Sequence, residues 1–166
     1  MSKRKSAVRV IGMVLLLICV WVGSFSIVAF SAQRTVVKGI SMEPSYHEGD
    51  HLLVNKLSVK FKPIERNDVI TVVRDDGTKI IKRVVALPGE TVQITNGLLY
   101  INGEAQVTKF ENMNDPGCAK DPITLKSDEY FVLGDNRNNS ADSRMHGPIR
   151  KDQIIGKVAF KMHEAN

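Results

Sequence analysis

A serine in a turn-prone segment is the first side chain of this sequence suited to chemistry. Ser41 lies in the segment 39–45 (GISMEPS), between a glycine and a proline. A sharply turning backbone there would expose both its hydroxyl, a nucleophile, and its own N–H, a donor for a developing oxyanion. Glu43 stands where the G-x-S-x-G nucleophile elbow has its second glycine, so that motif is absent. The segment alone is also compatible with an ordinary turn serine.

Lys82 is the second candidate, because it would be the single charge on an apolar strand face. Strand alternation across 79–90 (KIIKRVVALPGE) puts four residues on that face: Ile80, Lys82, Val84 and Ala86. Desolvation lowers the pKa of a lysine, and a neutral amine can act as a general base. A fall from ~10.4 to about 8 costs roughly 3 kcal/mol, which is typical of functional sites. The alternative is a lysine that extends its ammonium along an apolar stem to water.

A third, densely polar segment follows an apolar run near the C-terminus. Residues 134–144 (GDNRNNSADSR) contain several short side chains that can bond to the local backbone. A plain surface turn would explain the composition. Eleven residues are nevertheless too many for a simple hairpin connection, and loops of this kind often support sites.

Short apolar runs separated by turn residues predict the elements that hold these segments. The expected strands cover 51–54, 69–73, 79–87, 91–95, 98–101, 130–133 and 154–162. Pro88-Gly89 suits a type II turn, and Asn96-Gly97 is a strong hairpin signal. Strands at this spacing indicate a mainly β, antiparallel domain. The least patterned stretch, 105–127, is interpreted as a surface excursion between strands.

The first thirty residues predict a membrane anchor. Residues 10–30 carry no charge, and a helix of that length spans roughly 30 Å, the thickness of a bilayer core. The positive-inside rule makes 1–9 a cytoplasmic basic tail, 10–30 the transmembrane anchor and 31–166 an extracytoplasmic catalytic domain. The alternative is a cleavable secretory signal ending at the small residues of 29–31, although this apolar run is longer than usual for one.

Charge, histidine and cysteine placement weigh against other classes of protein. The tail holds four of the basic residues, which leaves 19 basic against 18 acidic residues elsewhere, so no nucleic-acid partner is expected. Neither a metal nor another cofactor is expected, because His47 and His51 are denied a shared helix face and the other histidines lack partners at ligand spacing. Cys19 and Cys118 fall in different parts of the chain and are not expected to pair.

Together the segments resemble the signature boxes of bacterial type I signal peptidases of the Ser/Lys-dyad kind. The matching boxes are SMEPS at 41–45, KRVVALPGE at 82–90 and GDNRNNSADSR at 134–144, and RNDVI at 66–70 is similar to a fourth box, RGDIV. The resemblance covers about residues 8 to 160. It implies a signal-peptidase-type β domain behind a single anchor. Gly39, where some members have serine, is similar to Gram-positive members, and Asn67 replaces the usual glycine of the fourth box.

The resemblance also implies roles for particular residues. Ser41 would be the nucleophile and Lys82 the general base, with the Lys82 amine oriented by Ser140. Asp142 and Arg144 would brace the loop.

Further implied roles concern the bound substrate. The oxyanion would be held by the Ser41 N–H and the region of Gly39. The family's preference for small residues at the −3 and −1 positions implies shallow pockets, for which Val37, Met42 and Ile81 are candidates.

The function implied is removal of signal peptides from exported preproteins at the plasma membrane, with preproteins and the lipid bilayer as partners. A Ser/Lys peptidase dedicated to one client, such as a pilin or conjugation protein, would share the dyad and the anchor. A non-catalytic membrane-tethered β module is the third interpretation, and the presence of both Ser41 and Lys82 weighs against it. A triad using His47 as the base stays open from sequence.

Overall fold

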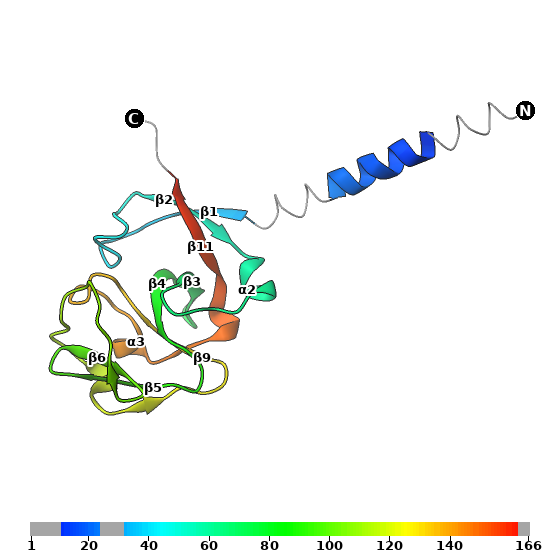
Figure 1. Ribbon diagram of the computed structural model, residues 1–166. Coiled ribbons are helices and arrows are strands. Elements are labelled where there is room, and N and C mark those ends of the chain that lie inside the picture. The colour runs from blue at the N-terminus through cyan, green and yellow to red at the C-terminus, as the bar shows by residue number, and fades with distance from the viewer. Residues whose placement is uncertain (1–10, 24–31, 163–166) are drawn as a thin grey trace, which may run out of the picture. The chain divides into compact units, whose positions relative to one another are not determined.

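The computed structural model describes residues 11–23 and 32–162 (Figure 1). Residues 11–23 are helical. Within the two described ranges, no helix combines the length and the apolarity needed to cross a bilayer. The expected anchor over 10–30 extends beyond this helix at both ends, and the expected basic tail at 1–9 lies outside the described residues.

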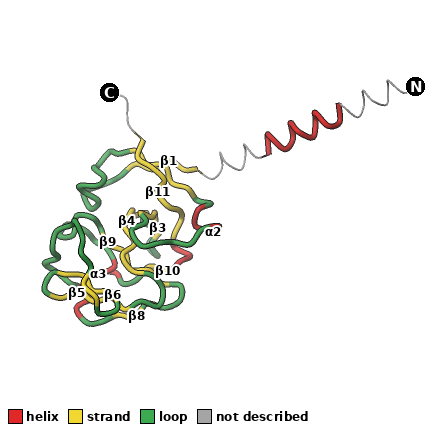
Figure 2. Tube along the Cα trace, viewed as in Figure 1, coloured by secondary structure: helices red, strands yellow, loops and turns green. Residues whose placement is uncertain are grey.

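A seven-stranded sheet forms the centre of the folded unit (Figures 1 and 2). Its order is β1(Ala32–Val36), β2(His51–Asn55), β11(Ile154–Met162), β3(Val69–Val73), β4(Lys79–Ala86), β9(Glu129–Leu133) and β10(Ile149–Arg150). The pairings from β2 to β10 are all antiparallel. The antiparallel β prediction is therefore confirmed, and each expected strand is present within one residue of its expected bounds.

A second, four-stranded sheet has the order β7(Glu104–Ala105), β6(Leu98–Ile101), β5(Thr91–Thr95) and β8(Ile123–Thr124). Asn96 and Gly97 join β5 to β6 with φ of 51° and 78°, the positive values that a type I′ hairpin turn requires. Gly89 has φ of 81°, and the Glu90 N–H donates to Leu87 O at 3.1 Å. Both predicted turns are therefore confirmed.

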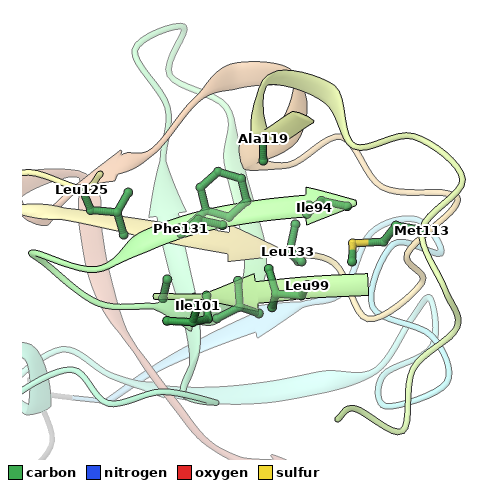
Figure 3. Close-up of a cluster of buried hydrophobic side chains, with 11 residues drawn as sticks. Ile94, Leu99, Ile101, Met113, Ala119, Leu125, Phe131 and Leu133 are labelled. Atoms are coloured by element: carbon green, nitrogen blue, oxygen red, sulfur yellow. The ribbon is translucent and has the colours of Figure 1, made fainter. Parts of the chain in front are cut away.

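Two apolar clusters hold the sheets together, and β4 contributes to both. The cluster in Figure 3 includes Val85 and Ala86 and joins the second sheet to β9. The other contains Val84, with Ile80 packed against it. The register of β4 against β9 shifts between Val84 and Ala86. The bulge ends the strict alternation, so the expectation that Ala86 shares a face with Val84 is wrong.

Short elements escaped the sequence analysis. They are α2(Ser58–Phe61), η1(Gly117–Lys120), α3(Ser143–His146) and η2(Lys151–Gln153), with the strands β1, β7, β8 and β10. The stretch 105–127 is only partly a surface excursion. Figure 3 shows three of its residues in the core, each at most 6% exposed: Met113, Ala119 and Leu125.

Candidate active site

A compact turn between β1 and β2 presents Ser41. The Glu43 N–H donates to Ile40 O at 3.1 Å and the Tyr46 N–H to Met42 O at 2.9 Å. Asn136, from the loop after β9, donates its N–H to Ser41 O at 3.1 Å and its Nδ2 to Ile40 O at 3.2 Å. The backbone that carries the hydroxyl is therefore held from two directions, as a preorganised nucleophile requires.

Lys82 reaches Ser41 from the middle of β4. Its backbone is paired with Ile70 of β3, and its Nζ lies 2.7 Å from Ser41 Oγ. The side chain is 3% exposed, so the amine has lost its hydration. This distance lies within the reach that proton transfer between a nucleophile and its base requires.

Burial is the main influence on the Lys82 amine. Desolvation lowers the pKa of Lys82 from 10.5 to about 8, opposed by the charges of Asp142 and Asp135 and aided slightly by Arg74. No carboxylate hydrogen-bonds to Nζ within the described residues. An ammonium in this position would be poorly compensated, so a useful fraction of the amine is neutral near pH 8.

Asp142 and Arg144 form a buried pair that shapes the loop. Arg144 Nε and Nη2 donate to the two carboxylate oxygens of Asp142, both at 2.9 Å. The Gly134 N–H also donates to Asp142 at 3.0 Å, and Asp142 caps α3 through the Arg144 N–H. Burial raises the pKa of Asp142, but the bonds from Arg144 and Gly134 outweigh it and hold that pKa below its ordinary value.

Ser140 lies close to the Ser41 turn but does not make the expected hydrogen bond to Lys82. Its buried Oγ has no hydrogen-bond partner among the described residues. Its proximity helps to lower the pKa of Asp142, although the geometry falls short of a hydrogen bond. The loop therefore brings Ser140 close to the Ser41 turn without joining its hydroxyl to Lys82.

Gly134 explains how Ser140 comes so close to the nucleophile. A Cβ at position 134 would lie 2.2 Å from Ser140 Oγ and 2.5 Å from Ser41 O. No real side chain fits at these distances, so the close approach of the loop to the Ser41 turn depends on a glycine here. Sequence reasoning noted Gly134 only as the first residue of the polar segment.

A groove of about 630 Å³ opens on the dyad. Its lining includes Ser41 and Lys82 and all three expected pocket residues, Val37, Met42 and Ile81. Val37 and Met42 are buried, whereas Ile81 is half-buried. Apolar walls next to a nucleophile suit small apolar side chains of an extended peptide.

One of the two expected oxyanion donors is already hydrogen-bonded within the protein. The Gly39 N–H already donates to Glu48 Oε1 at 3.0 Å, so it is occupied in this structure. Gly39 has φ of 75°, a value that glycine takes readily. The Ser41 N–H faces no such carboxylate partner among the described residues.

Three further residues near the dyad were not singled out as site residues. Asn136 fastens the nucleophile turn, as described above. Arg83 donates Nε and Nη2 to the two oxygens of Asp135 at 2.7 and 2.6 Å, and Nη1 to Asn67 O at 2.8 Å. Asn67 has φ of 73°, which confirms that asparagine serves in the turn where the family usually has glycine.

The histidine alternative finds no support in the geometry. His47 is exposed, and its backbone bonds run to Asp50. Across residues 11–23 and 32–162, no group of three or more His, Cys, Asp or Glu side chains is arranged to hold a metal ion.

Comparisons with known proteins identify the family of this chain. The family described as "Signal peptidase, peptidase S26" matches residues 5–163. A Bacillus subtilis protein named "Signal peptidase I V" is 38% identical over 136 residues, which are 74% of this chain and 81% of that protein. "Signal peptidase IB" of Staphylococcus aureus is 32% identical over 157 residues, which are 84% of this chain and 80% of that protein.

A crystal structure of a signal peptidase I from Enterococcus faecalis is also similar. It is 32% identical, covers 59% of this chain and 98% of its own, and has a TM-score of 0.49. The family match over residues 5–163 includes the Ser41 turn, strand β4 and the loop 134–144. The chain therefore belongs to the S26 signal peptidase family, as a serine endopeptidase of the type I, Gram-positive kind.

Proposed function

We propose that this protein removes signal peptides from exported preproteins, using Ser41 as the nucleophile and Lys82 as the general base. The observation that carries the proposal is the 2.7 Å contact between Lys82 Nζ and Ser41 Oγ, made by a lysine that is 3% exposed. The printed names of the relatives supply the substrate class.

The reaction follows from this contact. Neutral Lys82 takes the Ser41 hydroxyl proton as Oγ attacks the scissile carbonyl carbon, and the carbonyl π electrons move to oxygen. The Ser41 N–H donates to that oxyanion. The tetrahedral intermediate expels the amine, which takes its proton from the Lys82 ammonium, and an acyl-enzyme ester is left.

Water completes the turnover. Lys82, neutral again, takes a proton from a water molecule that attacks the ester carbonyl. The second intermediate collapses as the Lys82 proton returns to Ser41 Oγ, and the carboxylic acid product leaves and loses its proton to solvent. One lysine thus acts alternately as base and acid, which requires a pKa near the working pH.

Each supporting residue has a proposed part. Asp142 and Arg144 fix the loop, and Ser140 orients the Lys82 amine when its hydroxyl rotates toward Nζ. Val37, Met42 and Ile81 form the walls that select small residues at −3 and −1. Gly39 becomes a second oxyanion donor only when its N–H leaves Glu48.

The membrane places enzyme and substrate together. An anchor over 10–30 with a cytoplasmic tail at 1–9 would leave the catalytic domain, 31–166, outside the plasma membrane. Ser41 would then follow the anchor by about ten residues, within roughly 35 Å of the surface. A signal peptide is cut just outside its own apolar helix. The enzyme and its substrate would therefore be held at the same membrane surface, which raises their effective concentration.

The test compares four versions of the full chain in detergent: wild type, Ser41→Ala, Lys82→Met and His47→Ala. Wild type and His47→Ala should release the mature product of a purified preprotein after a small-x-small site. Ser41→Ala and Lys82→Met should stay folded by circular dichroism and lose at least about 10³-fold in kcat/KM. Loss of activity in His47→Ala with retention in Lys82→Met would overturn the dyad.

Substrate breadth separates the general enzyme from the single-client alternative. The general enzyme should cut preproteins of unrelated mature sequence at similar kcat/KM. If the chain cuts one client and no generic preprotein, the dedicated interpretation replaces it. If no preprotein is cut, the interpretation as a non-catalytic module replaces the general enzyme.

A further inference from the structure

A second cavity is lined by Arg83 and Val85 of β4, farther along the strand than Lys82. It measures about 400 Å³, and its lining includes four cations and an aromatic ring: Arg66, Arg83, Lys109, Arg137 and Phe110. It shares no lining residue with the groove of Ser41 and Lys82. Lys82 and Arg83 are adjacent in β4, so their side chains leave opposite faces of the strand.

Two of these cations are already satisfied. Arg83 is paired with Asp135 through two bonds, and Arg66 with Glu90 at 2.6 Å. Arg66 also donates to the Val85 carbonyl. These two arginines line the cavity, but carboxylates of the same domain already neutralise most of their charge.

Arg137 is different, because it is buried and two of its three guanidinium nitrogens have no hydrogen-bond partner among the described residues. It is 2% exposed, and neither Nε nor Nη1 has a hydrogen-bond partner among the described residues. Its guanidinium lies 4.8 Å from the centre of the Phe110 ring, a cation–π contact. A buried guanidinium without a hydrogen-bonded anion is costly.

No carboxylate bonds to the Arg137 guanidinium among the described residues, although two lie near enough to affect its pKa. Burial lowers the pKa of Arg137 to about 10, and the charges of Asp135 and Asp142 oppose the effect without bonding to it. Lys109 contacts the same Phe110 ring at 5.5 Å. Glu111, beside an adjoining cavity, already accepts a hydrogen bond from Asn138 Nδ2 at 3.3 Å.

We propose that this cavity is a binding site for a phosphate group, with Arg137 as the buried ligand and Lys109 as the exposed one. An arginine donates in a planar fork that matches phosphate oxygens, and an exposed lysine adds a mobile charge at the mouth. Phe110 holds the guanidinium plane from one side. This site shares no lining residue with the groove of Ser41 and Lys82, so the proposal does not depend on the peptidase mechanism.

Phosphate could come from solution or from a phospholipid headgroup. A headgroup brings acyl chains, which would meet Val107, fully exposed beside Phe110 at the cavity. Free phosphate gains nothing from such contacts. Inorganic phosphate and monomeric dihexanoyl phosphatidic acid therefore distinguish the two sources.

The experiment is isothermal titration of the full chain in uncharged detergent with sodium phosphate, at constant ionic strength. One phosphate should bind per chain, and Arg137→Met should weaken binding about tenfold or more. Lys109→Met changes an exposed side chain and should weaken phosphate binding by about threefold. Arg150→Met, which removes an exposed arginine paired with Asp75 and Asp152, should stay within about twofold.

Three results decide the matter. No saturable binding by wild type, or equal loss in Arg150→Met and Arg137→Met, overturns the site. Tighter binding of dihexanoyl phosphatidic acid than of phosphate, reduced by Arg137→Met, supports the site and assigns it to a headgroup. Equal affinity for both supports the site and assigns it to free phosphate. A retained preprotein cleavage rate in Lys109→Met shows that the peptidase is intact.

Discussion

Asp142 raises the pKa of Lys82 while burial lowers it. The two residues make no hydrogen bond to each other, since the Asp142 carboxylate is committed to Arg144 and to the Gly134 N–H. The carboxylate therefore acts on the Lys82 amine through space. Burial lowers the pKa of Lys82, and the charges of Asp142 and Asp135 limit that fall.

Replacing Asp142 by Asn should lower the pKa of Lys82 further. Removing a negative charge disfavours the ammonium, so the rising limb of the pH profile of kcat/KM should move to lower pH. The variant should also lose about 3 kcal/mol of unfolding free energy, because Arg144 would be left buried without a carboxylate. Asp50→Asn, which breaks a half-buried ion pair with Lys161, should leave the rising limb of the pH profile at the same pH. A shift to higher pH would contradict the through-space effect.

The wild-type pH profile should report the base directly. Below pH 8 the Lys82 amine is mostly protonated and cannot take the Ser41 proton, so kcat/KM should rise tenfold per pH unit. The rise should level off near pH 8, the value to which burial lowers this pKa. Initial rates of preprotein cleavage between pH 5 and 10 measure it. A limb centred near 6.5 would instead indicate a histidine.

Lys82→Met should make the stability of the fold less dependent on pH. The folded-state pKa of about 8 lies below the unfolded value of 10.5, so the unfolded chain binds more protons between them. Wild-type stability, relative to Lys82→Met, should therefore rise by about 3 kcal/mol as the pH passes through this window. Denaturant unfolding at several pH values tests it. A constant difference would show that Lys82 is not desolvated.

Gly134→Ala should damage catalysis more than folding. The new methyl group would meet Ser140 Oγ at 2.2 Å and Ser41 O at 2.5 Å, so the loop must retreat from the nucleophile turn. We expect a loss of about 1–3 kcal/mol in stability from overpacking, and at least about 10²-fold in kcat from misplacement. Gly12→Ala, where the methyl group meets nothing within 4 Å, is the matched control. An unchanged kcat would show that the position of Ser41 does not depend on a glycine at 134.

Thr71→Val should stabilise the protein. Thr71 is 3% exposed and lines the groove beside Ser41 and Lys82, and its Oγ1 has no partner among the described residues. Valine has the same shape without an unsatisfied hydroxyl, so the unfolding free energy should increase by about 1 kcal/mol. Thermal unfolding beside wild type measures it. Lower stability would mean that the hydroxyl is satisfied by water in the groove.

Local signals predicted most of the fold because they act over a few residues. The Asn96-Gly97 turn fixes one hairpin, and the break at Gly89 ends β4 where expected. The two-residue strands β7, β8 and β10 carry no period long enough to detect. The bulge after Val84 also left no mark in the sequence, since pairing with β9 creates it.

The dyad was predictable, but its environment was not. Ser41 and Lys82 stand in recognisable segments, and the alternation of β4 indicated burial of the lysine. The tether from Asn136, the closeness of Ser140 to Gly134 and the unpaired Arg137 all depend on contacts between distant parts of the chain. Such contacts follow from the packing of the whole domain, which no short segment encodes.

The place of β11 in the sheet has a consequence for biosynthesis. This last strand lies between β2 and β3, and its Lys157 pairs with Ile70, the same residue that pairs with Lys82. The ribosome releases Ser41 and Lys82 early, yet the sheet that joins them closes only when residue 162 has been made. The dyad can therefore form only after nearly the whole domain has left the ribosome, because β11 must first join the strands on its two sides.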